Sequence, residues 1–209
     1  MATYKLTVPI SEEEIRKLAV GDQVLLSGTI VTGRDAAHKF LIENFIHGDP
    51  SKASPEDRKV YERLKELLKE GVLYHCGPVV GKKEDGIYYF VAAGPTTSIR
   101  EEPYEAEVIE HFRLRGVIGK GGMGAKTLEA LQKFGAVYFH AVGGAASLIA
   151  NAVKEVVEVH KLEFGVPEAF WVIRVEDFPV VVTMDSHGNS IHSVVEKESR
   201  KNLESLLAG

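Results

Sequence analysis

The feature that most constrains this chain is the alternation of short apolar segments with helical patterns along its 209 residues. Segments rich in β-branched residues and leucine predict strands at 23–32, 72–76, 87–92, 117–118, 137–141, 171–175 and 180–184. Apolar residues at helical spacing predict helices at 11–18, 34–44, 55–71, 104–112, 126–134 and 145–153, followed by a polar C-terminal helix at about 192–207. This alternation favours a layered α/β domain with mixed sheets over a sandwich or a helical bundle.

Length and charge limit the class of protein. With 44% hydrophobic residues the chain can bury a real core, and we expect a single domain spanning 1–209. A formal net charge of −5 gives no overall basic surface, so nucleic acid is a poor default partner. Residues 1–10 lack the pattern of a signal peptide, and no uncharged run is long enough to cross a membrane. We therefore expect a cytoplasmic protein without a membrane segment.

Cys76 is the single cysteine of the sequence. It excludes an internal disulfide and any metal or cluster site built from several cysteines of this chain alone. Cys76 lies in an apolar run that Gly77 and Pro78 terminate, so we expect it to be a small buried hydrophobic residue.

A glycine-rich loop at 119–124 has the G-x-G-x-x-G pattern between a predicted strand and a predicted helix. A dinucleotide site would need an acidic residue at the end of the next strand, where His140 and Ala141 stand instead. The loop also lacks the spacing of a phosphate loop. We expect an anion site with Lys120 as a point charge at a helix N-terminus, although a tight turn with an exposed Lys120 is the alternative.

Two further segments supply groups that suit a carboxylate. After a predicted strand, 94–100 carries the hydroxyls of Thr96, Thr97 and a serine, followed by the guanidinium of Arg100. Arg34 is a third cation and stands at the end of another predicted strand. The alternative for the first segment is ordinary turn chemistry, with Arg100 paired on the surface to Glu101 or Glu102.

Three strings together resemble a known enzyme family. They are GTIVTGRDAAHK at 28–39, GPTTSIR at 94–100 and GKGGM at 119–123. They are similar to the β subunit of two-subunit class I fumarases and of the related L(+)-tartrate dehydratases, which corresponds to the C-terminal domain of single-chain class I fumarases. The resemblance runs nearly end to end and includes HCGP at 75–78, FHAVGG at 139–144 and DSHGN at 185–189.

The resemblance implies the swivelling β/β/α fold and a heteromeric hydro-lyase. In that family a separate α subunit holds a four-iron, four-sulfur (4Fe-4S) cluster on three cysteines, so we expect this chain to hold no metal. The expected assembly contains two α and two β subunits. The expected substrate is a small dicarboxylate.

The resemblance also implies residue roles. It assigns carboxylate binding to Arg34, Thr97, Arg100 and Lys120. Thr96 matches the threonine that removes a proton beside the carboxylate, Lys120 is also expected to act in catalysis, and Asp35 and His38 match supporting residues. A lone threonine hydroxyl is too weak an acid to relay a proton unaided, so the family would place an aspartate of the α subunit against it. Glu101 stands where we expect methionine in many relatives, and we expect its side chain to point to solvent.

Three functions remain open at this stage. The first is the interconversion of fumarate and L-malate, the second is the dehydration of L(+)-tartrate to oxaloacetate, and the third is a non-enzymatic carboxylate-binding or regulatory module. Six histidines show no metal-ligand spacing and are expected in the core or on the surface: His75, His111, His140, His160, His187 and His192. A turn is predicted at 185–189, and the sequence assigns no role to His140 or His187.

Overall fold

The computed structural model describes residues 2–207. Its strands are β1 (Thr3–Val8), β2 (Gln23–Thr32), β3 (Val72–Tyr74), β4 (Val79–Lys82), β5 (Tyr88–Ala92), β6 (Gly116–Gly119), β7 (Val137–His140), β8 (Val153–His160) and β9 (Phe170–Met184). Its α-helices are α1 (Glu12–Ile15), α2 (Asp35–Leu41), α3 (Pro55–Leu68), α4 (Glu105–Phe112), α5 (Ala125–Phe134), α6 (Ala146–Ala150) and α7 (Ile191–Leu207). A π-helical segment, η1 (Ile42–Ile46), continues α2, and short 3-10 helices lie at η2 (Pro50–Lys52), η3 (Ser98–Glu101) and η4 (Leu162–Phe164).

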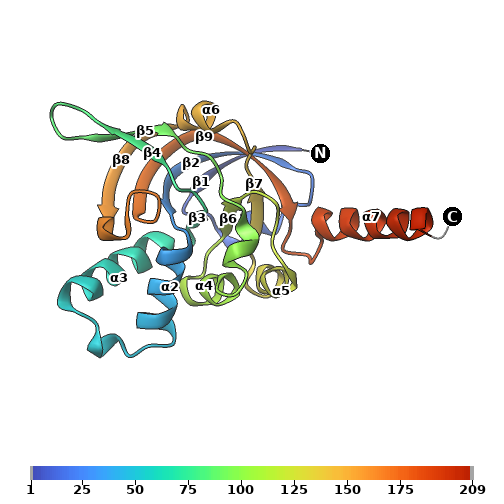
Figure 1. The fold of residues 1–209 in the computed structure, drawn as a ribbon, viewed down its shortest axis with the longest axis horizontal. Coiled ribbons are helices and arrows are strands. Elements are labelled where there is room, and N and C mark those ends of the chain that lie inside the picture. The colour runs from blue at the N-terminus through green and yellow to red at the C-terminus, as the bar shows by residue number, and fades with distance from the viewer. Residues whose placement is uncertain (1, 208–209) are drawn as a thin grey trace.

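The larger sheet closes on itself. Its strand order is β1-β2-β3-β6-β7-β9-β8, and β9 also pairs with β2. Strands β2, β3, β6 and β7 run parallel, whereas β9 is antiparallel to both β7 and β2. These five strands therefore form a closed mixed barrel, with β1 and β8 paired to β2 and β9 (Figure 1).

Alternate residues of the barrel strands face two separate cores. Tyr74 and Trp171 belong to the inner cluster of buried residues. Their sequence neighbours Leu73 and Val172 belong to a second cluster, which includes buried residues of α2 through α5. These helices lie together below the barrel in Figure 1, so the second core fills the space between the barrel wall and a helical layer.

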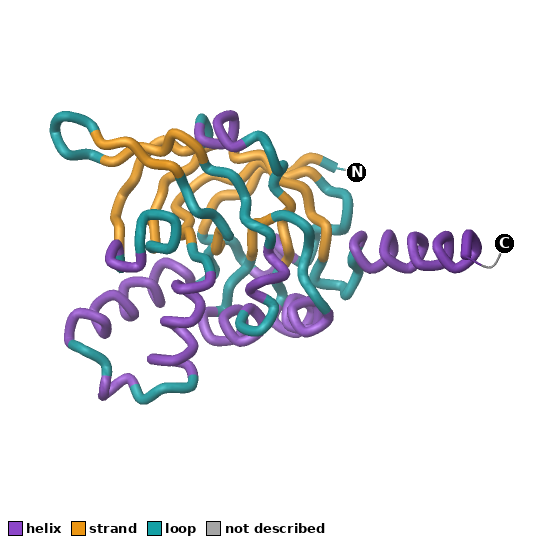
Figure 2. Tube along the Cα trace, viewed as in Figure 1, coloured by secondary structure: helices purple, strands orange, loops and turns teal. Residues whose placement is uncertain are grey.

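The expectation of a mixed α/β fold is confirmed, but closure of the sheet into a barrel was not predicted. The two strands expected at 171–175 and 180–184 are one continuous strand, β9. Strands β1, β4 and β8 were missed. Helix α7 occupies the segment where a C-terminal helix was expected, and it projects away from the barrel (Figure 2). No helix within 2–207 has the length and apolar character needed to cross a membrane.

Gly28 allows β1 to lie against β2. Its φ is +109°, and an added Cβ would lie 2.7 Å from the backbone oxygen of Val8. Gly28→Ala should therefore lower the free energy of unfolding by more than the roughly 1–2 kcal/mol of left-handed strain alone. The matched control is Gly86→Ala, where φ is +87° but the nearest atom lies 3.7 Å away on the flexible Lys82 side chain. Urea unfolding that gives equal losses for both variants would contradict this account.

Candidate functional site

The loops that carry Thr96 and Lys120 are joined by backbone hydrogen bonds. The Thr96 amide donates to the His75 carbonyl at 2.7 Å, and the Lys120 amide donates to the Thr96 carbonyl at 3.1 Å. The Ser98 amide returns a bond to the Lys120 carbonyl at 3.0 Å. The segment containing Thr97 therefore runs parallel to the end of β6 and is held there like a short additional strand.

This close approach depends on Gly119, the last residue of β6. A Cβ at this position would lie 1.8 Å from Ser98 Oγ and 2.8 Å from the Tyr138 hydroxyl. The first glycine of the loop thus serves packing between the Ser98 segment and the barrel, rather than access for a nucleotide.

A protein carboxylate occupies amides at the N-terminus of α5, where an anion site was expected. Glu102 accepts hydrogen bonds from the amides of Gly124 and Thr127 at 2.7 and 3.2 Å and from the Thr127 hydroxyl at 2.7 Å. An internal carboxylate therefore satisfies the free amides and the positive end of the helix dipole. Lys120 remains a candidate through its pairing with the Thr96–Thr97 segment.

Arg34 and Arg100 come together at the start of α2. Arg34 precedes the helix, its Nη1 lies 3.4 Å from Glu168 Oε1, and its Nε is buried without a hydrogen-bond partner within 2–207. Arg100 forms an ion pair with Asp35, the first residue of α2. The alternative considered for Arg100 was a surface pair with Glu101 or Glu102, and its partner is instead Asp35.

Glu101 does not point to solvent, contrary to expectation, because its side chain is fully buried. Burial and the neighbouring Asp35 carboxylate raise the pKa of Glu101 to about 8. The neighbouring Glu101 carboxyl and the Arg100 guanidinium lower the pKa of Asp35. Both Glu101 oxygens are buried without a hydrogen-bond partner within 2–207, so a neutral, protonated Glu101 avoids an unpaired buried charge beside Asp35.

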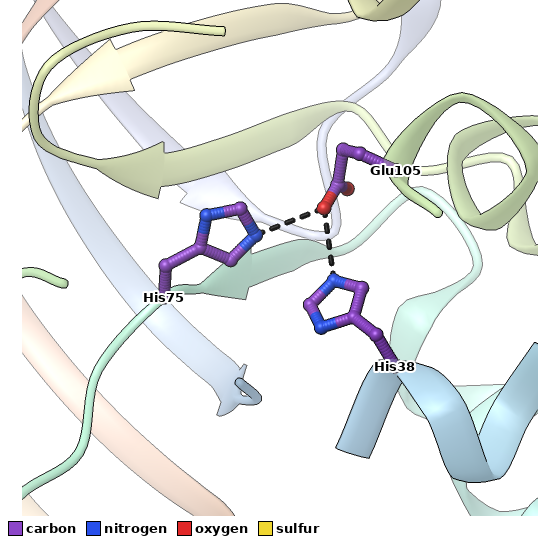
Figure 3. A group of neighbouring side chains, drawn as sticks. All are labelled: His38, His75 and Glu105. Carbon is purple, nitrogen blue, oxygen red and sulfur yellow. Dashed lines mark hydrogen bonds and ion pairs between the residues drawn. The ribbon is translucent and has the colours of Figure 1, made fainter. Parts of the chain in front are cut away.

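His38 lies with His75 and Glu105 in a fully buried group (Figure 3). The Nε2 atoms of both histidines lie 2.9 Å from the same oxygen of Glu105. Burial acts to raise the pKa of Glu105, but the two histidines outweigh it and lower that pKa. Sequence reasoning assigned no role to His75 or Glu105, since 30 residues separate them and neither lies at a ligand-type spacing.

The predicted residues thus form two sets. Thr96, Thr97 and Lys120 meet through the backbone, and Arg34, Asp35 and Arg100 meet at the start of α2. The buried group that includes His38 lies between these sets. Thr97 and Arg100 are exposed to solvent, and the surface that carries them is the exposed face of the candidate site.

The remaining candidates have structural surroundings. Cys76 is buried as expected, and burial raises the pKa of its thiol to about 12, so the thiol stays protonated. His187 donates a hydrogen bond to the Arg16 carbonyl at 3.0 Å. His140 lies beside His192, and burial lowers the pKa of His140.

The raised pKa of Glu101 predicts a pH-dependent cost in stability. The folded chain keeps this proton up to pH about 8, whereas the unfolded chain releases it near the usual value of 4.5. Stability of the wild type therefore falls between these pH values, by at most about 1.4 kcal/mol per pH unit. Glu101→Gln is neutral at every pH and removes this dependence, so the stability of the variant relative to wild type should rise from pH 4.5 to 8 and then level off.

Urea unfolding at pH 5, 7 and 9 measures this difference. Glu129→Gln, at an exposed position of α5, is the matched control for the substitution itself. A stability difference between Glu101→Gln and wild type that is constant with pH would rule out a protonated Glu101.

The sequence matches the family described as Fumarase C-terminus over residues 2–195. A candidate class I fumarate hydratase from Geobacillus stearothermophilus is 50% identical over 198 residues, which are 95% of this chain and 35% of that protein. This chain thus spans about a third of that relative. A candidate L(+)-tartrate dehydratase subunit beta from Methanocaldococcus jannaschii is 40% identical over 200 residues, 95% of each chain. The L(+)-tartrate dehydratase subunit beta of Escherichia coli K12 is 41% identical over 187 residues, covering 89% of this chain and 85% of that one. This chain therefore belongs to the Fumarase C-terminus family, with class I fumarate hydratases and L(+)-tartrate dehydratase beta subunits as its homologues.

Proposed function

We propose that this chain is the β subunit of an iron–sulfur-dependent hydro-lyase that reversibly hydrates fumarate to L-malate. The observation that carries the proposal is that hydrogen bonds join the loops of Thr96, Thr97 and Lys120, with Arg100 exposed farther along the Thr96 loop. Such a face offers cations and hydroxyls to a small dicarboxylate. We further propose that residues 1–209 act as one domain of the swivelling β/β/α type.

Carboxylate binding is proposed for Arg34, Thr97, Arg100 and Lys120. Removing a proton beside a carboxylate builds further negative charge on an already anionic group. Cations that bind this charge more strongly in the transition state than in the substrate would raise the rate. Asp35 would support the site by orienting Arg100, with which it forms an ion pair.

Thr96 is the proposed proton-transfer residue. Its amide and carbonyl are both fixed by hydrogen bonds, to His75 and Lys120, and its side chain is half-buried. A hydroxyl needs a neighbouring base to accept and pass on a proton, and we propose that a carboxylate of the α subunit supplies it.

The four-iron, four-sulfur cluster is assigned to the partner chain. The donor set here does not suit a cluster, because the one cysteine of the sequence is buried and burial raises its pKa to about 12. When bound by the partner, the cluster would supply a Lewis acid for the departing hydroxyl group. Relatives named "subunit beta" support an α-subunit partner, and we propose an assembly of two α and two β subunits.

Dehydration of L(+)-tartrate to oxaloacetate is the second candidate. It is favoured by two relatives named as L(+)-tartrate dehydratase beta subunits, which this chain matches over 95% and 85% of their lengths. L-malate and L(+)-tartrate both carry two carboxylates and at least one hydroxyl, so the same cations suit either one.

The split site predicts that activity requires both chains. This chain alone should turn over neither L-malate nor L-tartrate, whereas the anaerobically reconstituted complex with its α partner should form fumarate from L-malate. Absorbance of fumarate and a coupled assay for oxaloacetate measure the two reactions. Oxaloacetate formation alone would select the second candidate, and turnover by the isolated chain would overturn the split site. A complex with an intact cluster that acts on neither substrate would favour the non-enzymatic carboxylate-binding module.

Substitutions should separate proton transfer from binding. In the reconstituted complex, Thr96→Ala should lower kcat by at least about 100-fold with little change in substrate binding. Thr96→Ser, which keeps the hydroxyl, should restore much of the rate. Arg100→Ala should lower turnover and also weaken substrate binding, because it removes a cation rather than a proton carrier. Steady-state kinetics and equilibrium binding check these outcomes, and near-normal kcat in Thr96→Ala would refute its role.

A further inference from the structure

Behind the exposed face, a buried set of hydrogen bonds connects the loop of Thr96 to the loop of Arg34. Its centre is Glu105, the first residue of α4, which accepts from His38 and His75 through one oxygen at 2.9 Å each (Figure 3). The three side chains are at most 1% exposed. Water therefore cannot replace these bonds, and the two rings hold fixed orientations about the carboxylate.

The partners of His38 define its protonation. Its Nδ1 lies 2.9 Å from the Arg34 carbonyl oxygen, and its Nε2 faces the Glu105 carboxylate. Since both partners are acceptors, both ring nitrogens carry hydrogen. The hydrogen bond and charge of Glu105 accordingly raise the pKa of His38, against the opposing effect of burial. His38 and Glu105 thus form a buried ion pair.

His75 is the neutral member of the group. Burial lowers its pKa, and its Nε2 donates to Glu105. Its Nδ1 lies 2.8 Å from Ser98 Oγ, which in turn accepts a hydrogen bond from the Tyr138 hydroxyl at 2.8 Å. The Ser98 hydrogen is therefore free to be donated to His75 Nδ1.

The two ends of this set reach the loops of the candidate site. The His75 carbonyl accepts the Thr96 amide at 2.7 Å, and the His75 ring fixes Ser98, so both neighbours of Thr97 are held by one residue. At the other end, the ring and the amide of His38 both donate to the Arg34 carbonyl at 2.9 Å.

We propose, on the basis of the proposed function, that Glu105 and His75 are positioning residues that set the Thr96 hydroxyl and the Arg34 guanidinium relative to one another. They act through the backbone of the two loops and do not touch the substrate. Displacing a reacting group by about 1 Å can lower a rate about 100-fold, so such a bridge has a measurable effect on turnover.

The same three residues could by type also hold a metal ion, since their ligand atoms lie within 4.8 Å of one another. A histidine ligates a metal through a nitrogen lone pair, and His38 has none while both of its nitrogens donate hydrogen bonds. The hydrogen bonds satisfy His38, His75 and one oxygen of Glu105 without an ion. We therefore assign the group as a hydrogen-bonded bridge.

Glu105→Gln tests the bridge, because it keeps the shape of the side chain and removes the charge that His38 requires. In the reconstituted, cluster-loaded complex, kcat should fall about 10- to 100-fold with little change in KM. The matched control is Glu158→Gln. The Glu158 carboxylate also binds a cation, Arg63, and a histidine, His160, but its contacts join α3 to β8, away from the candidate site. This control should leave kcat unchanged.

Two measurements on this chain do not depend on its activity. Nitrogen-15 NMR should show His38 protonated at both nitrogens and His75 at Nε2 alone at pH 7, and Glu105→Gln should remove the charge on His38. Amide hydrogen exchange at Thr96 should accelerate in Glu105→Gln but not in Glu158→Gln. Unchanged exchange at Thr96, or stoichiometric Zn²⁺ binding that Glu105→Gln abolishes, would overturn the proposal.

Ser98→Ala is a second variant that creates no unpaired buried charge, so it keeps the test possible if Glu105→Gln does not fold. It removes the hydrogen bond to His75 and should change kcat and Thr96 exchange in the same direction. Wild-type complex that turns over neither substrate would refute the proposed function alone, because the NMR and exchange measurements would still decide the bridge. Normal kcat in both folded variants would refute the bridge.

Discussion

The antiparallel pairing of β9 with β2 is the interaction on which the rest of the structure depends. Without it, β2, β3, β6 and β7 would form an open parallel sheet with an exposed edge at β2. Closure fixes the carboxyl ends of β2, β3 and β6 against one another. Arg34, His75 and Lys120 lie within two residues of those ends, which is where open and closed α/β sheets present their ligand-binding loops.

The sequence predicted those elements that depend on interactions between residues close together in the chain. Helix α1 begins with a capping box of Ser11 and Glu14, inside the segment where a helix was expected, and β2 has the predicted bounds. Barrel closure could not be predicted in the same way, because it depends on register between strands about 150 residues apart. Strand β8 was missed because charged residues interrupt its apolar alternation, as is usual for a strand at the edge of a sheet.

The candidate site shows the same division. The sequence placed the cations and hydroxyls at strand ends, and the structure brings those loops together. The side chain of Glu101 was wrongly expected in solvent, because a carboxylate among the three of 101–105 is typical of a solvated segment when tertiary contacts are unknown. Each carboxylate instead has its own surroundings. Glu101 is buried near Asp35 without a hydrogen-bond partner within 2–207, Glu102 caps α5, and Glu105 pairs with His38.

These three arrangements have a common electrostatic consequence for the exposed face. An ionised carboxylate left free beside Arg100 and Lys120 would compete with an anionic substrate for the same cations. Glu101 avoids this by keeping its proton, Glu102 by binding helix amides, and Glu105 by burial against an imidazolium. The carboxylates of Asp35 and Glu168 remain on the two arginines, where they orient the guanidinium groups. A dicarboxylate must therefore add to these ion pairs or displace them, which makes the strength of the Asp35–Arg100 contact a determinant of affinity.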